Sequence, residues 1–300
     1  MTRNALLLLL KAAVSVGLIA WLATRIDLGP MRDAFATLDP AWTALALVFL
    51  GAQLILAGLR WSWIHAGRRE VLAPRDAVEL AFVGQFFNQT LPSAIGGDAV
   101  RAILAAKRGL TGSQAASGVI LDRGLALTVL VALMAFAAPI LPAQAAVWSA
   151  AIAFASLAAL AAGLLLARRV RPFLPAWRAL EWSYGVADDL RAILADPKLL
   201  IASLTVHLGV IATFWALAQA LDVPAGFALC LAAVPPVVLL STLPISLAGW
   251  GVREGAAVFM FGLAGIASGD ALALSIAFGL AQIAIGVPGL ILWLKGRRDG

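Results

Sequence analysis

The sequence predicts an all-α, polytopic membrane protein with about six full transmembrane helices and two inverted re-entrant helical hairpins. The composition is 62% hydrophobic and only 13% charged over 300 residues. A soluble domain carries about 25% charged residues, so this chain has too little polar surface to face water on all sides. Long apolar runs recur along it, and two further apolar stretches break at proline and glycine. Most of the surface is therefore expected to face lipid.

Other features of the composition exclude several classes of protein. Cys230 is the single cysteine, which excludes a disulfide framework, and no Cys/His spacing indicates zinc. We therefore expect no metal and no cofactor. The net charge of +6 is attributed to the placement of the loops, and no nucleic-acid partner is expected. No polar stretch is long enough for a separate soluble domain, so residues 1–300 are interpreted as a single transmembrane domain.

A helix needs about 20 consecutive apolar residues to cross a bilayer. Six runs meet that length: 5–24, 41–59, 117–141, 145–167, 199–221 and 271–294. The first run resembles a signal peptide, because basic residues accompany it. Lys11 interrupts it and no clear A-x-A site follows, so we interpret it as an uncleaved first span.

Two apolar stretches, 77–95 and 225–269, do not fit this pattern. The first contains several amides and leads into a charged segment too short to cross back through lipid. A helix that enters, turns and leaves on the same side satisfies it, provided that protein or water surrounds the broken backbone. The second stretch breaks at Pro235-Pro236 and again over 244–251, and it is either a second hairpin or two full spans. Both options return the chain to the side it left.

The basic residues predict the orientation. Of the 22 basic residues, 17 lie at the amino end, at the carboxyl end, or in 60–75, 102–115 and 168–198. The positive-inside rule places these segments, and both termini, in the cytoplasm of a bacterial cell with this chain in its inner membrane. Arg60, Trp61 and His65 are assigned to a cytoplasmic loop and its interface. Segment 168–198 is expected to form an amphipathic helix on the cytoplasmic surface, with a simple linker as the alternative.

An internal repeat relates the two unusual stretches. Residues 90–101 align without gaps on 242–253, and six of the twelve positions are identical: Thr, Leu, Pro, Gly, Val and Arg. Three predicted spans separate the copies, so the first hairpin opens from the cytoplasm and the second from outside. The inverted repeat is centred on 76–108 and 226–267. Broken segments of opposite orientation are typical of transporters whose substrate site lies near the midplane of the bilayer.

Six ionisable residues lie at membrane depth in this topology. Each would cost about 2.5–3.5 kcal/mol if it faced lipid, so they are expected to face protein or a cavity. They are Asp98, Arg101, Asp122, Arg123, Arg253 and Glu254. A competing interpretation is that three acids and three bases only pair with one another and lock the hairpins.

The repeated arginines suggest a phosphate site. Arg101 and Arg253 each follow a hairpin tip by about one helical turn, where free N–H groups and a guanidinium fork suit a phosphate. Asn88 and Gln89 supply neutral hydrogen-bonding groups nearby. Trp250 takes the place of Asp98 in the second copy, where it either stacks on a ligand or plugs the tip.

At these residues the sequence resembles the family of the lysylphosphatidylglycerol synthase transmembrane region, also called flippase-like. The motifs are 85–101, Asp122-Arg123 and 243–255, and the resemblance covers nearly the whole chain. It implies transfer of a phosphate-bearing lipid across the cytoplasmic membrane. Some members carry an added aminoacyltransferase domain. Because this chain ends at Gly300, soon after its last span, we expect the synthase activity to be absent.

These observations predict a lipid flippase that is not an enzyme and whose partner is an anionic phospholipid or polyprenyl-phosphate-linked lipid. No ATP-binding motif is present, so an ion or lipid gradient is expected to drive it. Two alternatives stay open: a membrane-embedded lipid-modifying transferase, and an accessory subunit of a lipid-synthesis complex. The sequence is compatible with a homo-oligomer, and it does not identify the lipid or the direction of transport.

Overall fold

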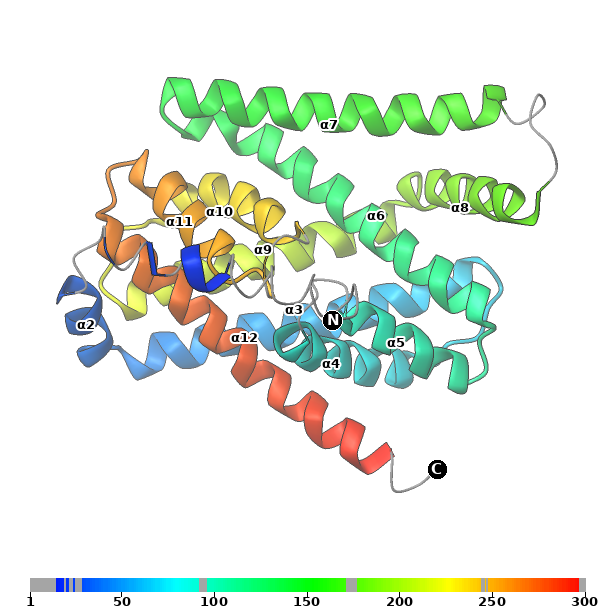
Figure 1. Ribbon diagram of the computed structural model, residues 1–300, viewed down its shortest axis with the longest axis horizontal. Helices are drawn as coiled ribbons and strands as arrows, with labels where there is room; N and C mark the ends of the chain where they lie inside the picture. The colour runs from blue at the N-terminus through cyan, green and yellow to red at the C-terminus, as the bar shows by residue number, and fades with distance from the viewer. Residues whose placement is uncertain are drawn as a thin grey trace.

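The computed structural model describes residues 15–18, 20, 21, 24, 29–91, 96–170, 177–243, 246 and 248–296. Within these residues every regular element is helical (Figure 1). The helices are α2 (Gly29–Ala36), α3 (Pro40–Gly67), α4 (Pro74–Thr90), α5 (Gly96–Lys107), α6 (Gly112–Ala137), α7 (Ala143–Val170), α8 (Arg178–Leu194), α9 (Pro197–Ala220), α10 (Phe227–Ser241), α11 (Val252–Gly262) and α12 (Ser268–Gly296), with a 3-10 turn, η1 (Ala138–Ile140), after α6.

Five helices of the described chain are long and apolar enough to cross a membrane. They correspond to five of the six predicted spans: Pro40–Gly67, Gly112–Ile140, Ala143–Ala167, Pro197–Ala220 and Ser268–Gly296. The sixth predicted span, 5–24, lies largely outside the described residues. The polytopic helical prediction is thus confirmed for the described part of the chain.

Local sequence determines where the spanning helices begin. Asp39 precedes α3 and accepts hydrogen bonds from the backbone N–H groups of Ala41 (2.7 Å) and Trp42 (3.2 Å). At the start of α6, Thr111 and Gln114 cap each other reciprocally, with contacts of 2.8 and 3.2 Å. Such caps satisfy N–H groups that a helix leaves unpaired at its first turn. The capped starts lie beyond the apolar runs, so α3 and α6 are longer than those runs predicted.

Each copy of the repeat joins two short helices that pack together (Figure 1). α4 ends at Thr90 and α5 begins at Gly96, while α10 ends at Ser241 and α11 begins at Val252. The tips, 92–95 and most of 244–247, lie outside the described residues. In the first pair the chain returns to its starting point, because Arg108, just after α5, contacts Asp76 in the first turn of α4 at 2.6 Å.

The expected break at Pro235-Pro236 is wrong, since α10 continues through both prolines. Membrane helices tolerate proline because neighbouring groups satisfy the freed carbonyls. The break expected over 244–251 is consistent with the end of α10 and with left-handed backbone at Ala248 (φ 49°), Gly249 (φ 81°) and Gly251 (φ 85°).

Within the segment 168–198, Arg178–Leu194 form α8, which packs on α6, α7 and α9. Val186, Leu190 and Leu194 turn toward a core cluster that includes Leu121 of α6. Asp189 on the same helix pairs with Arg68 at 2.8 Å. α8 therefore covers one end of α3 and α6.

The exposed surface is strongly apolar. α7 lies along one edge of the molecule (top of Figure 1), and Trp148, Phe154 and Leu165 on it are each more than 60% exposed. The largest core cluster lies instead among α3, α9, α10, α11 and α12, where the ring of Phe214 stacks on Phe278 at 4.2 Å. Apolar side chains outside and buried charges inside are what a lipid-facing helical bundle requires.

Candidate functional site

Five charged side chains from α3, α5 and α6 form one buried chain of ion pairs. Ordered by contact they are Arg60, Asp122, Arg101, Asp98 and Arg123. Of the charges predicted to face protein, Asp98, Arg101 and Asp122 are at most 7% exposed, and Arg60, which was assigned to a loop, is buried with them.

Asp122 lies at the centre of this α3–α6 cluster and binds two arginines. Its Oδ1 atom accepts a hydrogen bond from Arg60 Nε (3.0 Å), and its Oδ2 atom accepts one from Arg101 Nη2 (3.0 Å). Arg60 Nη1 also donates to the hydroxyl of Ser203 on α9 at 2.8 Å. The carboxylate therefore ties together α3, α5 and α6.

Asp98 likewise bridges two arginines. Its Oδ1 atom lies 3.0 Å from Arg101 Nε, and its Oδ2 atom accepts a hydrogen bond from Arg123 Nε at 2.6 Å. The side chain of Arg123 is 43% exposed, so the chain of ion pairs is open at this end. Each of the three guanidinium groups pairs with one or both of the two carboxylates, so these five side chains carry a net charge of +1.

Close backbone packing positions Arg101. A Cβ on Gly97 would lie 2.0 Å from the carbonyl oxygen of Gly84, so only glycine permits α4 and α5 to approach this closely. Asn88 accepts a hydrogen bond from the N–H of Gly97 at 2.9 Å. The guanidinium of Arg101 lies 4.7 Å from the ring centre of Trp61, a cation–π contact.

The second copy of the repeat forms a smaller buried cluster around Arg253. Arg253 Nε donates to Glu254 Oε1 at 2.9 Å, and the hydroxyl of Ser275 on α12 donates to the same oxygen at 3.2 Å. Glu254 Oε2 accepts from the N–H of Gly251 at 2.6 Å, which fixes the start of α11. Here one cation faces one anion, so the α11–α12 cluster is balanced.

Amides connect this cluster to the first hairpin. The Oε1 atom of Gln282 accepts from Gln89 at 3.1 Å and lies 3.4 Å from Nη1 of Arg253. Asn88 at the end of α4 thus contacts the first copy of the repeat, and its neighbour Gln89 is linked to Arg253 of the second copy through Gln282 of α12. The end of α4 lies between the two arginine sites.

The two arginines have similar surroundings built from different positions. Trp250 lies over the guanidinium of Arg253 at 4.5 Å, as Trp61 lies over Arg101. Trp250 therefore contacts Arg253 of its own repeat copy. Neither of the two roles predicted for Trp250, stacking on a ligand or plugging the tip, included this contact.

Three residues assigned to a cytoplasmic loop and its interface are instead buried in α3. Arg60 is 3% exposed, and Trp61 and His65 are fully buried. His65 Nδ1 lies 2.6 Å from Glu70 Oε2. The missed signal is the spacing of Arg60, Trp61, Ile64 and His65, which places them on one face of a helix that continues to Gly67.

Known proteins show similarity along most of the chain. Residues 8–289 match the model of the lysylphosphatidylglycerol synthase TM region family. One similar curated protein is described as a UPF0104 membrane protein of Methanothermobacter thermautotrophicus, at 32% identity over 116 residues. That alignment covers 37% of this chain and 34% of the relative, about a third of each protein.

Proposed function

Since this chain belongs to the lysylphosphatidylglycerol synthase transmembrane-region family, we propose that it moves a phosphate-bearing lipid between the leaflets of the bacterial cytoplasmic membrane. The proposed substrate is a phospholipid or a polyprenyl-phosphate-linked lipid. The protein changes the leaflet of the lipid and leaves its covalent structure intact.

The uncompensated positive charge of the α3–α6 cluster supports this proposal best. A net charge in a largely buried cluster is costly, and a bound anion would reduce that cost. A lipid phosphate supplies one negative charge and oxygens that accept two guanidinium hydrogen bonds side by side. A ligand would reach the cluster at Arg123, because Arg123 is its exposed end. The head group would approach Arg123 and reach Arg101.

The lengths of the short helices support two re-entrant hairpins. At 1.5 Å per residue, α4 and α5 are about 26 and 18 Å long, and α10 and α11 about 22 and 16 Å. A hydrocarbon core is about 30 Å thick, so none of the four spans it alone. Two inverted hairpins would expose their arginines to opposite sides, and exchanging conformations would move the head group from Arg101 toward Arg253.

A flipping assay tests the proposal. Purified protein is placed in liposomes with fluorescent phosphatidylglycerol, phosphatidylethanolamine or a polyprenyl phosphate, and a membrane-impermeant reductant reports the leaflet. Arg101→Ala should slow transfer about ten- to a hundredfold, since a charge-assisted hydrogen bond contributes about 1.5–3 kcal/mol. Arg32→Ala is the matched control, because that side chain is exposed on α2 and belongs to neither arginine cluster.

Two results would contradict the proposal. One is transfer no faster than in protein-free vesicles for all three lipids. The other is a change in lipid mass, which would indicate a transferase. The double variant Asp98→Ala/Arg101→Ala tests the head-group role separately. It keeps the surplus charge of the cluster, so normal transfer by this variant would exclude Arg101 as the phosphate ligand.

A further inference from the structure

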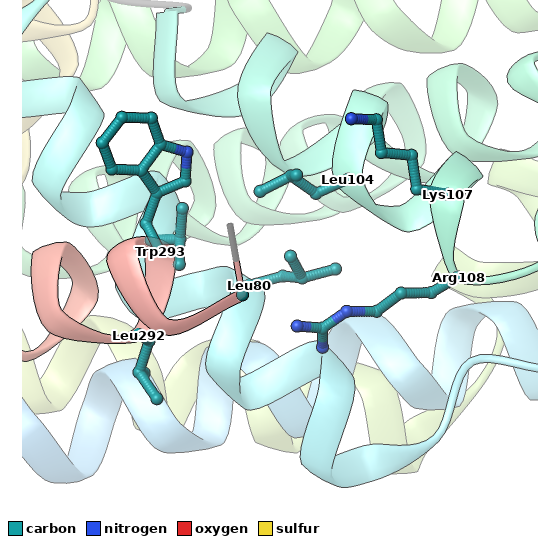
Figure 2. Close-up of a pocket in the computed structure, with 8 residues that line it drawn as sticks. Leu80, Leu104, Lys107, Arg108, Leu292 and Trp293 are labelled. Atoms are coloured by element: carbon teal, nitrogen blue, oxygen red, sulfur yellow. The ribbon is translucent and has the colours of Figure 1, made fainter. Parts of the chain in front are cut away.

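A cavity of about 600 Å³ lies between α4, α5 and α12, and Figure 2 shows the side chains that line it. Its labelled residues are Leu80 from α4, Leu104 and Lys107 from α5, Arg108, and Leu292 and Trp293 from α12. This volume falls within the range of small-molecule sites, roughly 300–1,000 Å³. The lining residues belong to neither arginine cluster.

The shape of the cavity follows from how α12 crosses α4. At the crossing the helices touch, because a Cβ on Gly289 would lie 2.0 Å from the carbonyl oxygen of Phe82. Beyond that point the last turns of α12 extend away from the other helices (Figure 1). Leu292 and Trp293 line the gap on the α12 side, where the ring of Trp293 also packs edge-on against Phe87 of α4 at 5.3 Å. The gap is a wedge with apolar walls.

One end of the wedge is cationic. Arg108 pairs with Asp76 (2.6 Å) and with Glu79 (3.1 Å), and Glu79 also pairs with Arg75. Lys107 is exposed and forms no ion pair within the described residues. Among the described residues three cations face two anions here, so Lys107 carries a charge that none of them neutralises. In Figure 2 the guanidinium of Arg108 extends toward Leu80, and the end of Lys107 lies on the side of Leu104.

We propose that this wedge binds one anionic phospholipid, with its phosphate at Lys107 and an acyl chain against Leu80, Leu104 and Trp293. Apolar walls and a single surplus cation match the two ends of such a lipid, and basic pockets between membrane helices bind anionic head groups. The expected orientation places the end of α5 at the cytoplasmic interface, where head groups lie. The site supplies lipid to the arginine clusters, and that role alone rests on the proposed function.

Native mass spectrometry of the purified protein tests the binding. The protein is titrated with phosphatidylglycerol and, separately, with phosphatidylcholine of the same acyl chains. Lys107→Gln should weaken phosphatidylglycerol binding about fivefold, because one basic residue near a membrane surface contributes about a factor of that size. Lys198→Gln is the matched control, since Lys198 is an exposed lysine that stacks on Trp63 at 3.9 Å, outside the cavity. Leu104→Trp, which fills the wedge, should also weaken binding.

Each outcome decides the proposal. Equal affinity for the two lipids, or unchanged phosphatidylglycerol binding in either Lys107→Gln or Leu104→Trp, would overturn it. Displacement of the lipid by millimolar inorganic phosphate would indicate a free-anion site and overturn it too. Arg101→Ala separates the two proposals, because it should retain this lipid while losing transfer. If Lys107→Gln loses transfer but still binds phosphatidylglycerol as the wild type does, the proposed function stands and the wedge is not the lipid site.

Discussion

Arg60 and Arg101 donate to the same carboxylate, that of Asp122, which is 4% exposed and lies inside the packed bundle. Each arginine also has a second contact: Arg60 with Ser203 and Arg101 with Asp98. Because the contacts differ, the two arginines should respond differently to substitution. Arg60 is the more structural of the pair, since both of its contacts join helices and neither leads to the exposed end of the cluster.

We predict that Arg60→Ala destabilises the protein by about 1.5–3 kcal/mol, because it removes the charge-assisted hydrogen bonds from Arg60 to Asp122 and Ser203. The single cysteine makes the measurement direct. Cys230 is fully buried, so a thiol-reactive dye reports unfolding as the temperature rises. Arg75→Ala should unfold as the wild type does. A melting temperature for Arg60→Ala equal to that of the wild type would contradict a structural role for the Arg60–Asp122 pair.

The variant Arg101→Lys tests whether the geometry of the guanidinium at position 101 matters in addition to its charge. Lysine keeps the positive charge, but it loses the two-pronged guanidinium that contacts Asp98 and Asp122 at 3.0 Å each. Transfer of labelled lipid should recover only partly relative to Arg101→Ala. Full recovery would show that charge alone matters at this position and would argue against a bidentate phosphate contact.

The residues of the site were predictable to the extent that charge stands out in an apolar run. Asp122 and Arg123 interrupt a predicted span, so their burial and pairing could be expected from the sequence. Arg60 lies one residue beyond the run 41–59, where an arginine is ordinary. Its partners come from α6 and α9, and only tertiary packing brings those helices to it. Pair formation of this kind has no local signal in sequence.

At the scale of elements, the α4–α5 hairpin depends on one close approach. Gly97→Ala should destabilise the protein by about 1–3 kcal/mol, the usual cost of overpacking, because the added Cβ would overlap the carbonyl oxygen of Gly84. The same thiol assay measures the change. Gly163→Ala in α7 is the control, since no atom lies within 4 Å of its added Cβ and alanine favours helix by about 1 kcal/mol. Equal stability of the two variants would show that α4 and α5 do not pack as described.

Helix positions were largely predictable, and helix continuity was not. Apolar runs located five spans, and their ends shifted outward because caps such as Asp39 and Thr111 lie in polar sequence. The proline pair in α10 was misjudged because proline predicts a break only where freed carbonyls lack other partners. That condition depends on neighbouring helices, which a single sequence does not show.

At the scale of the whole molecule, the inverted repeat makes a prediction about sides of the membrane. Ser113 follows the α4–α5 hairpin and Ser268 follows the α10–α11 hairpin, and both residues are exposed. The spanning helices α6, α7 and α9 lie between them. An odd number of crossings places the two serines on opposite sides, with Ser113 in the cytoplasm by the excess of basic residues near it.

Cysteine labelling in intact cells tests this topology. Ser113→Cys and Ser268→Cys each add one accessible thiol with little change in size, and the wild type is the background control because Cys230 is fully buried. A membrane-impermeant maleimide should label Ser268→Cys in intact cells and Ser113→Cys only after the membrane is opened. Labelling of both variants in intact cells would place the hairpins on one side. In that arrangement both arginine sites would open to the same solution, and exchange between them could not carry a head group across the membrane.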